Sequence, residues 1–229
     1  MITFKDYRAG YGQSEVLHGL DLQLGQGEIV AIMGRNGMGK TTLMKSLMGI
    51  VPSSGGHLSV DNIDVDGMKS FDRVQNGLGY VPQGRMIFPT MSVRENIETG
   101  LTSTRDTEIP ADLYELFPVL KEMNNRRGGN LSGGQQQQLA IARALATQPK
   151  VLLLDEPTEG IQPSIIREMA RVLKRIRDTR KLSILVSEQV LSFAMEIADR
   201  VLVLENGHFV HESYRKEIDE EKVASYLAV

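Results

Sequence analysis

The stretch GRNGMGKTT, residues 34–42, constrains the fold of this chain more than any other feature. It matches the pattern Gly-x-x-x-x-Gly-Lys-Thr and lies between the apolar run 28–33 and a helical pattern over 40–49. In such a loop backbone N–H groups turn inward around phosphate oxygens, which glycine permits because it has no Cβ and readily adopts positive φ. The stretch therefore predicts a strand, a phosphate-binding loop and a helix, in that order.

Two side chains of this loop carry chemistry of their own. Lys40 supplies a positive charge to the β- and γ-phosphates of a nucleotide, and Thr41 offers a hydroxyl to Mg²⁺. The free amides at the start of the following helix add the positive end of the helix dipole. A glycine-rich turn without a ligand is the alternative interpretation. The predicted nucleotide contacts are Gly34, Arg35, Asn36, Gly37, Met38, Gly39, Lys40, Thr41 and Thr42.

Four nearly continuous apolar runs predict strands that are buried on both faces, as in a parallel sheet between helices. The runs cover residues 28–33, 151–155, 182–187 and 200–206. Helical patterns lie among them, at residues 40–49, 135–146, 164–179 and 189–198. This order of strands and helices predicts an α/β fold.

The rest of the chain divides into two regions of different character. Residues 1–60 have short strand-like pieces with glycine breaks, which favours an antiparallel β layer, and residues 85–147 have helical patterns without an apolar strand run. At 229 residues the chain has the length of one domain. We therefore expect a single domain, with a core from about 1–84 and 148–229 and a helical subdomain over about 85–147.

Composition excludes several classes of protein. A net charge of −3 provides no overall field for nucleic acid, so we expect no nucleic-acid partner. The absence of cysteine rules out disulfides and thiolate metal sites. The opening residues lack a secretory signal, and no stretch has the roughly 18 apolar residues that span a bilayer. A role at a membrane would therefore need other chains to hold this one there.

An acidic pair, Asp155 and Glu156, follows the apolar run 151–155. In a parallel sheet this strand end lies at the same edge as the phosphate loop. Asp155 could then hold Mg²⁺, and Glu156 could orient or deprotonate a water in line with the γ-phosphate. Acidic residues are also common at solvated strand ends, and the phosphate loop upstream is what favours the catalytic interpretation.

The most specific stretch is NLSGGQQQQLAIARAL, residues 130–145, which resembles the signature of ABC-type ATPases. Ser132, Gly133, Gly134 and Gln135 open a helix with free amides, a second anion site without its own lysine. The resemblance covers essentially the whole chain. It implies a P-loop NTPase fold of the ABC ATPase type, with a RecA-like core, an N-terminal antiparallel β layer and a helical insert. It also implies that the signature of one subunit closes on ATP held by another.

Further roles follow from this resemblance alone. Tyr11 is similar to the aromatic residue that stacks on adenine, and Gln83 to the glutamine that contacts Mg²⁺ and the attacking water. Locally, Tyr11 could be an ordinary packed tyrosine and Gln83 a polar residue after a turn. Residues 86–88 (Met-Ile-Phe) begin the region that in this family receives a coupling helix of the permease, although an apolar run can equally be core.

Two positions depart from the common family pattern. Gln162 stands where a loop aspartate is usual, and Gln189 where most members have a histidine that contacts the γ-phosphate. Both amides can form hydrogen bonds, but neither carries a charge. We expect Gln189 to reach the nucleotide and to act in catalysis with Glu156 and Lys40, and Glu188 to be a structural or a solvated acid.

Three stretches resemble the ATPase subunits of importers for branched-chain amino acids and for urea or short-chain amides, and they are closest to the urea type. The stretches are DEPTEGIQPSII, YVPQGRMIFPTMSVRENI and SEQVLSFAMEIADR. This implies an ATP-hydrolysing subunit on the cytoplasmic face of the bacterial inner membrane. Its partners would be transmembrane permease subunits, a second ATPase subunit (different or identical) and, indirectly, a solute-binding protein. A soluble ABC-type ATPase acting on ribosomes or DNA, and a nucleotide-gated module with little turnover, are the alternatives.

The end of the chain, residues 208–229, is charged and helical in pattern. Val223, Tyr226 and Leu227 share one side, so we expect this segment to pack back on the core. His208 and His211 are three residues apart, but separate surface histidines are the more common case and we expect no metal site there.

Overall fold

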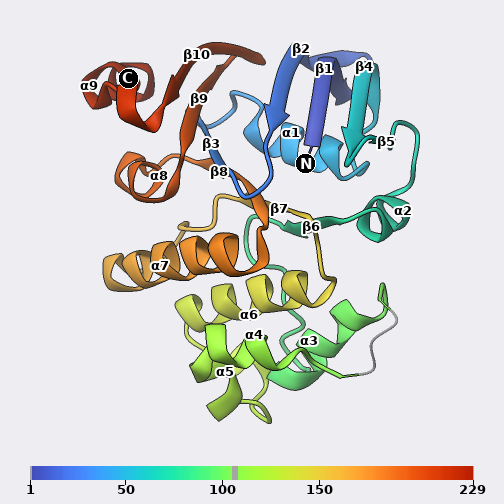
Figure 1. Cartoon of the computed structure of the whole chain (residues 1–229), viewed down its shortest axis with the longest axis vertical. Coiled ribbons are helices and arrows are strands. Elements are labelled where there is room, and N and C mark those ends of the chain that lie inside the picture. Colours follow the sequence, from blue (N-terminus) through green and yellow to red (C-terminus); the bar gives the residue numbers. More distant parts are fainter. Residues whose placement is uncertain (1, 105–107, 229) are drawn as a thin grey trace.

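The computed structural model describes residues 2–104 and 108–228. Its centre is a six-stranded sheet in the order β10-β9-β3-β8-β7-β6 (Figure 1). Five strands are parallel, and β10 runs antiparallel to β9. The strands are β3 (Ile29–Met33), β6 (Leu78–Val81), β7 (Val151–Asp155), β8 (Ser183–Glu188), β9 (Arg200–Glu205) and β10 (His208–Tyr214). All four strands predicted from apolar runs are present, each within one residue of the expected limits.

A second sheet of four antiparallel strands covers one face of the first, in the order β2-β1-β4-β5. Its strands are β1 (Ile2–Tyr11), β2 (Ser14–Leu24), β4 (Ser53–Val60) and β5 (Ile63–Asp64). It is the antiparallel layer expected for the N-terminal region. Helix α1 (Lys40–Leu47) lies between the two sheets and contributes buried residues to the core that they share (Figure 1).

Alternation along the central strands explains their continuous apolar composition. In β3, Ile29, Ala31 and Met33 face the core formed with the helices, whereas Val30 and Ile32 face the core shared with the antiparallel sheet. Both faces are buried, so every position is apolar. The helices on the face of Ile29, Ala31 and Met33 include α6 (Gly133–Ala146), α7 (Pro163–Arg180) and α8 (Leu191–Ile197).

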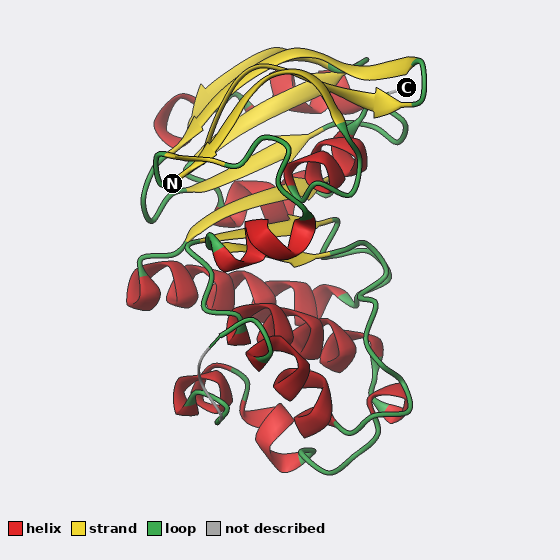
Figure 2. Ribbon diagram, turned by 90° about the vertical axis from the view of Figure 1, so that its right-hand side faces the viewer, coloured by secondary structure: helices red, strands yellow, loops and turns green. Residues whose placement is uncertain are grey.

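Between β6 and β7 the described residues form helices and loops with one isolated bridge. Figure 2 shows these helices gathered at the end of the molecule opposite the strands. They are α3 (Val93–Leu101), α4 (Ala111–Leu116), α5 (Pro118–Glu122), the short 3₁₀ turn η1 (Gly128–Asn130) and α6. No described helix combines the length and the apolar composition that crossing a bilayer requires.

The expectation of a helical pattern from residue 208 onward was wrong for its first part. Residues 208–214 form β10, because Asn206 and Gly207 adopt positive φ values of 46° and 76° and turn the chain back along β9. The helical part is limited to η2 (Arg215–Glu217) and α9 (Glu220–Leu227). In α9, Val223 is buried, and Tyr226 and Leu227 are partly buried against the core, as expected. The remaining helix, α2 (Ser70–Gln75), follows β5.

Candidate active site

The phosphate loop lies between β3 and α1 and borders a pocket of about 360 Å³. Gly37 and Gly39 have φ values of 84° and 109°, a conformation that L side chains rarely adopt, which explains the glycines at these two positions. The pocket is lined by Val16, Asn36, Gly37, Gly39, Lys40, Thr41, Thr42, Gln83 and Glu156. The phosphate loop, Gln83 and Glu156, which were predicted from three separate stretches of the sequence, thus meet in one cavity.

Three residues of the predicted loop do not line this pocket. Gly34 lies so close to β9 that a Cβ there would be 2.5 Å from the carbonyl oxygen of Leu204. The Met38 carbonyl accepts a hydrogen bond from Gly207 N–H at 3.1 Å. Arg35 takes part through its carbonyl oxygen, which accepts from Lys40 Nζ at 2.9 Å. Gly34 and Met38 therefore hold the loop against β9 and the β9–β10 turn, and Arg35 holds Lys40 within the loop.

Lys40 is only 3% exposed and its charge is already partnered. Its Nζ donates to the Gly34 carbonyl at 2.6 Å and lies 3.1 Å from Glu156 Oε1. A buried cation needs such partners because transfer from water is costly. We propose that a nucleotide phosphate takes over this charge from Glu156 when it binds.

Asp155 is buried at the carboxyl end of β7 and accepts hydrogen bonds from three hydroxyl groups. Its Oδ1 accepts from Ser187 Oγ at 2.6 Å and Thr41 Oγ1 at 3.2 Å, and its Oδ2 accepts from Tyr80 OH at 3.3 Å. Burial raises the pKa of Asp155, and the hydrogen bond from Ser187 is the largest opposing effect. A carboxylate next to a threonine hydroxyl is a donor set that suits Mg²⁺, so Thr41 and Asp155 would hold that ion.

Two of the predicted glutamines, Gln83 and Gln189, hold the side chain of Glu156. Gln83 Nε2 donates to its Oε2 at 3.3 Å, and Gln189 Nε2 donates to the same oxygen at 2.8 Å. Its backbone has a φ of 47°, and its N–H donates to both the carbonyl and the hydroxyl of Ser187. A carboxylate positioned in this way can accept a proton from a water molecule.

Glu188 is buried and structural; it is not solvated. Its Oε2 accepts from Thr158 Oγ1 at 2.8 Å, and its Oε1 accepts from the N–H groups of Gln189 and Val190 at 2.7 and 3.0 Å. Burial raises the pKa of Glu188. Because these bonds shape the turn after β8, α8 starts at Leu191, two residues later than the predicted helix. Gln189 therefore sits on a loop.

The signature residues form a capped helix start away from this pocket. Ser132 Oγ accepts from Gln135 N–H at 3.3 Å, and Gln135 Oε1 accepts from Ser132 N–H at 2.9 Å. A Cβ on Gly134 would lie 2.7 Å from Ile165 Cγ2 in α7, so this glycine permits close helix packing. None of the four signature residues lines the phosphate pocket of its own chain.

The remaining predicted positions lie at the edges. Tyr11 ends β1 and is 52% exposed, and it is Val16 rather than Tyr11 that lines the pocket. Gln162 precedes α7 without a side-chain capping bond. The sequence did not predict a role for Val16, Tyr80 or Ser187. The only signal for Tyr80 was a hydroxyl group in the short strand β6, and the only signal for Ser187 was a hydroxyl group at the end of the apolar run in β8.

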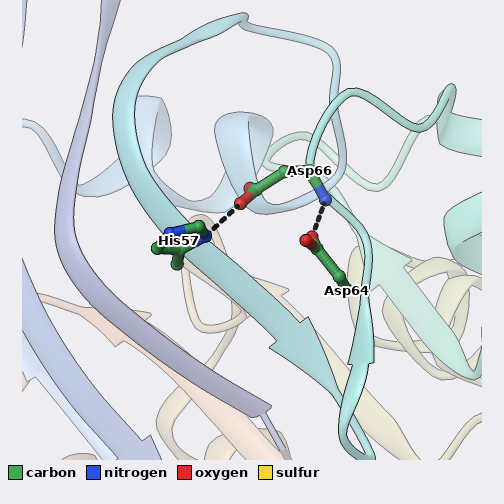
Figure 3. Close-up of side chains that lie close together, drawn as sticks. All are labelled: His57, Asp64 and Asp66. Carbon is green, nitrogen blue, oxygen red and sulfur yellow. Dashed lines mark hydrogen bonds and ion pairs between the residues drawn. The ribbon is translucent and has the colours of Figure 1, made fainter.

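None of the four histidines, all of which lie within the described residues, lines the phosphate pocket. The His208 ring stacks on His18 with the ring centroids 5.0 Å apart, and the His211 ring stacks on Tyr226 with the centroids 5.7 Å apart. Figure 3 shows His57, Asp64 and Asp66, whose potential ligand atoms lie within 4.8 Å of one another. Leu58 N–H already donates to Asp66 Oδ2 at 3.1 Å, and His57 and Asp64 are exposed, so we assign this group no metal.

The fold and this pocket define a P-loop ATPase. Residues 17–159 match the family model described as ABC transporter. The chain belongs to the ABC transporter family, and it is an ATPase that uses ATP with Mg²⁺.

Similar proteins cover nearly the full length of the chain. BraG of Pseudomonas aeruginosa, a high-affinity branched-chain amino acid transport ATP-binding protein, is 37% identical over 92% of this chain and 91% of its own. LptB of Escherichia coli, the lipopolysaccharide export system ATP-binding protein, is 31% identical over 99% of this chain and 96% of its own. The dimeric post-hydrolysis structure of the ATP-binding cassette MJ0796, with ADP and Pi, has a TM-score of 0.83 at 24% identity, covering 95% of this chain and all of that one.

Proposed function

We propose that this chain is the ATPase subunit of an importer for branched-chain amino acids, urea or short-chain amides. The observation that carries the proposal is the similarity to BraG along nearly the whole of both chains. The sequence around Gln162 and Gln189 favours the urea or amide type of importer within this group. No residue of an ATPase subunit contacts the transported solute, so the cargo has to be identified by measuring transport.

A groove of about 440 Å³ beside the helical region supports the proposal that this chain has a permease partner. Met86 and Phe88 line it and are 66% and 44% exposed. Arg143 also lines it, with its guanidinium 5.2 Å from the centre of the Phe88 ring and an N–H donated to the Met86 carbonyl at 2.8 Å. We propose that a cytoplasmic segment of a permease subunit docks here.

Charge supports the same partner. Burial lowers the pKa of Arg143, and among the described residues no carboxylate pairs with its guanidinium. An acidic side chain on the docking segment would supply that charge, and apolar side chains beside it would cover Met86 and Phe88. The exposed part of this groove would then be buried in the assembled transporter.

Arg85 provides a connection from this groove to the ATPase site. It follows Gln83 by two residues and has a φ of 68°. Its guanidinium donates to the carbonyls of Glu159 and Gly160 and to the Gln136 side chain in α6, at 3.2 to 3.4 Å. We propose that movement of the permease segment reaches Gln83 and the signature helix through this residue.

We further propose that two ATPase subunits pair beneath two permease subunits, on the cytoplasmic face of the inner membrane. The pairing is supported by the signature residues, which lie outside the phosphate pocket of their own chain and would meet the pocket of a second chain. The second ATPase is a different subunit if the importer follows the branched-chain amino-acid pattern. A solute-binding protein would deliver the cargo from the other side.

The test is uptake by cells or vesicles that contain the complete complex, with labelled urea, formamide and leucine compared. A Phe88→Ala variant should reduce uptake and cargo-stimulated ATP hydrolysis while it leaves ATP binding intact. Ile63→Ala is the matched control, because Ile63 on β5 is 43% exposed, close to the 44% of Phe88, but lies outside the groove. Uptake that persists without this chain would overturn the importer assignment.

A further inference from the structure

Ser187 is a hydroxyl residue in a position where the core pattern calls for an apolar side chain. It follows Ile184, Leu185 and Val186 in β8 and is itself completely buried. A buried hydroxyl is costly unless both its donor and its acceptor capacity are used. The contacts of Ser187 show how both are used.

Strand register brings Ser187 to Asp155. The two residues are paired across the parallel strands β7 and β8, so their side chains project toward the same face. Ser187 Oγ donates to Asp155 Oδ1 at 2.6 Å, shorter than the bonds that Thr41 and Tyr80 donate to this carboxylate at 3.2 and 3.3 Å. Ser187 is thus the strongest constraint on the orientation of the Asp155 side chain.

The same hydroxyl also holds the backbone of Glu156. Its oxygen accepts from Glu156 N–H at 3.2 Å, next to the 3.0 Å bond that this N–H makes to the Ser187 carbonyl. Glu156 has a φ of 47°, a left-handed conformation that a non-glycine residue keeps only where its surroundings impose it. One buried side chain therefore ties together the two acidic residues of the site.

We propose that Ser187 is a positioning residue that orients Asp155 toward a divalent cation and fixes the backbone from which Glu156 projects. Thr41 shares Asp155 with Ser187, and the Thr41 hydroxyl is itself a predicted ligand of the cation. When Thr41 binds the metal, Ser187 keeps its bond to the carboxylate. The proposal concerns Mg²⁺ and ATP chemistry and does not depend on the cargo or on the permease.

The test measures nucleotide affinity of the full chain as a function of Mg²⁺ concentration, with a fluorescent ADP analogue as the probe. Nucleotide affinity should increase as Mg²⁺ is added, and the Mg²⁺ concentration that gives half of this increase is the quantity compared. Ser187→Ala should raise that concentration by about tenfold, since a hydrogen bond to a charged group is lost. Affinity measured in EDTA should stay within about twofold of the wild type, because Ser187 lies outside the pocket that the phosphates occupy. Mn²⁺ binding followed by electron paramagnetic resonance gives the same comparison without any turnover.

Ser183 supplies a matched control in the same strand. It is 1% exposed, and like Ser187 it uses its hydroxyl both as donor and as acceptor: it donates to the Gly25 carbonyl at 2.7 Å and accepts from Gly27 N–H. Ser183→Ala should lower stability to a similar degree without a change in the Mg²⁺ requirement. Ser187→Thr, which keeps the hydroxyl, should restore the wild-type requirement if the buried site accommodates the added methyl.

Steady-state kinetics provide a second readout. Ser187→Ala should lower kcat more than it raises KM, because Glu156 loses part of its anchor while Lys40 and the loop amides still bind phosphate. The proposal fails if Ser187→Ala keeps the wild-type Mg²⁺ requirement, or if Ser183→Ala shifts it by the same factor. Either result would assign Ser187 to core packing alone.

Discussion

The side-chain amide of Gln189 donates a hydrogen bond to the Glu156 carboxylate, with Nε2 2.8 Å from Oε2. A neutral donor thus stands beside the predicted general base, where the family resemblance leads one to expect an imidazole. An amide keeps the same charge at every physiological pH, whereas an imidazole titrates near neutrality. The site of this chain therefore has one ionisable group fewer next to Glu156.

Gln189→His should add a titrating group beside Glu156 and so change the pH dependence of ATP hydrolysis. The Glu156 carboxylate favours the protonated imidazole and should raise its pKa above the ordinary value of about 6.5. Below that pKa the cation pairs with the base, so we expect ATP hydrolysis close to wild type at about pH 8 and a progressive fall toward about pH 6. The measurement is the pH–rate profile. Gln189→Asn, which adds no titrating group, is the control, and superimposable profiles for His and wild type would contradict the prediction.

Glu156→Gln should separate binding from turnover. It removes a proton acceptor that contributes on the order of 10²- to 10⁴-fold to a rate, so hydrolysis by the assembled complex should fall by that amount. ATP affinity should be unchanged or higher, because Lys40 no longer has a carboxylate 3.1 Å away and is available to phosphate. Glu159→Gln, three residues on and exposed, is the control. Unchanged turnover would remove Glu156 from the chemistry.

Glu188→Gln should raise the stability of the protein at neutral pH. Burial raises the pKa of Glu188 in the folded state. At a pH below the ordinary glutamate pKa, Glu188 is protonated and its contribution to the free energy of unfolding is complete. This contribution is lost as the pH rises through the raised pKa that Glu188 has in the folded protein. A neutral amide cannot lose a proton, so the free energy of unfolding should decline less with pH in the variant.

Denaturant unfolding at several pH values measures this difference. Glu95→Gln is a control of opposite sign, since hydrogen bonds from Ser92 lower the pKa of Glu95, and stability linked to it is lost on acidification. Equal pH slopes for wild type and Glu188→Gln would show that Glu188 does not titrate with folding.

Gly134→Ala should loosen the contact between α6 and α7. The new Cβ would be 2.7 Å from Ile165 Cγ2, which is attached directly to a Cβ and cannot swing away freely. We expect a loss of about 1–3 kcal/mol in the free energy of unfolding, the usual effect of overpacking. The Gly134→Ala/Ile165→Ala double variant should recover part of it. Additive losses in the double-mutant cycle would exclude this clash as the cause.

Elements with a strong local signal were predictable, and others were not. Strands β3, β7, β8 and β9 were found because burial on both faces leaves a continuous apolar run. Strand β6 was missed because it is four residues long and contains Gly79, and β10 because this edge strand, HFVHESY, has neither a continuous apolar run nor a strict alternation of polar and apolar residues. Without such a pattern, residues 208–214 were read together with the charged helical segment that follows them.

In the active site, motif residues were predictable but their neighbours were not. The phosphate loop and the acidic pair are each encoded in one short stretch. The contact of Ser187 with Asp155 depends on β8 lying beside β7, a strand order that no local pattern encodes. Glu188 was left undecided for the same reason, because its partner Thr158 is thirty residues away in the sequence.

The place of β3 in the sheet also determines when during synthesis the protein can bind nucleotide. The phosphate loop follows β3 directly, and β3 is flanked by β8 and β9, which end at residues 188 and 205. A nascent chain that has emerged only as far as residue 180 therefore carries a complete phosphate-loop motif on a strand with no neighbours in its own sheet. We therefore expect nucleotide binding to be acquired late in synthesis, only after β8 and β9 have emerged from the ribosome and paired with β3.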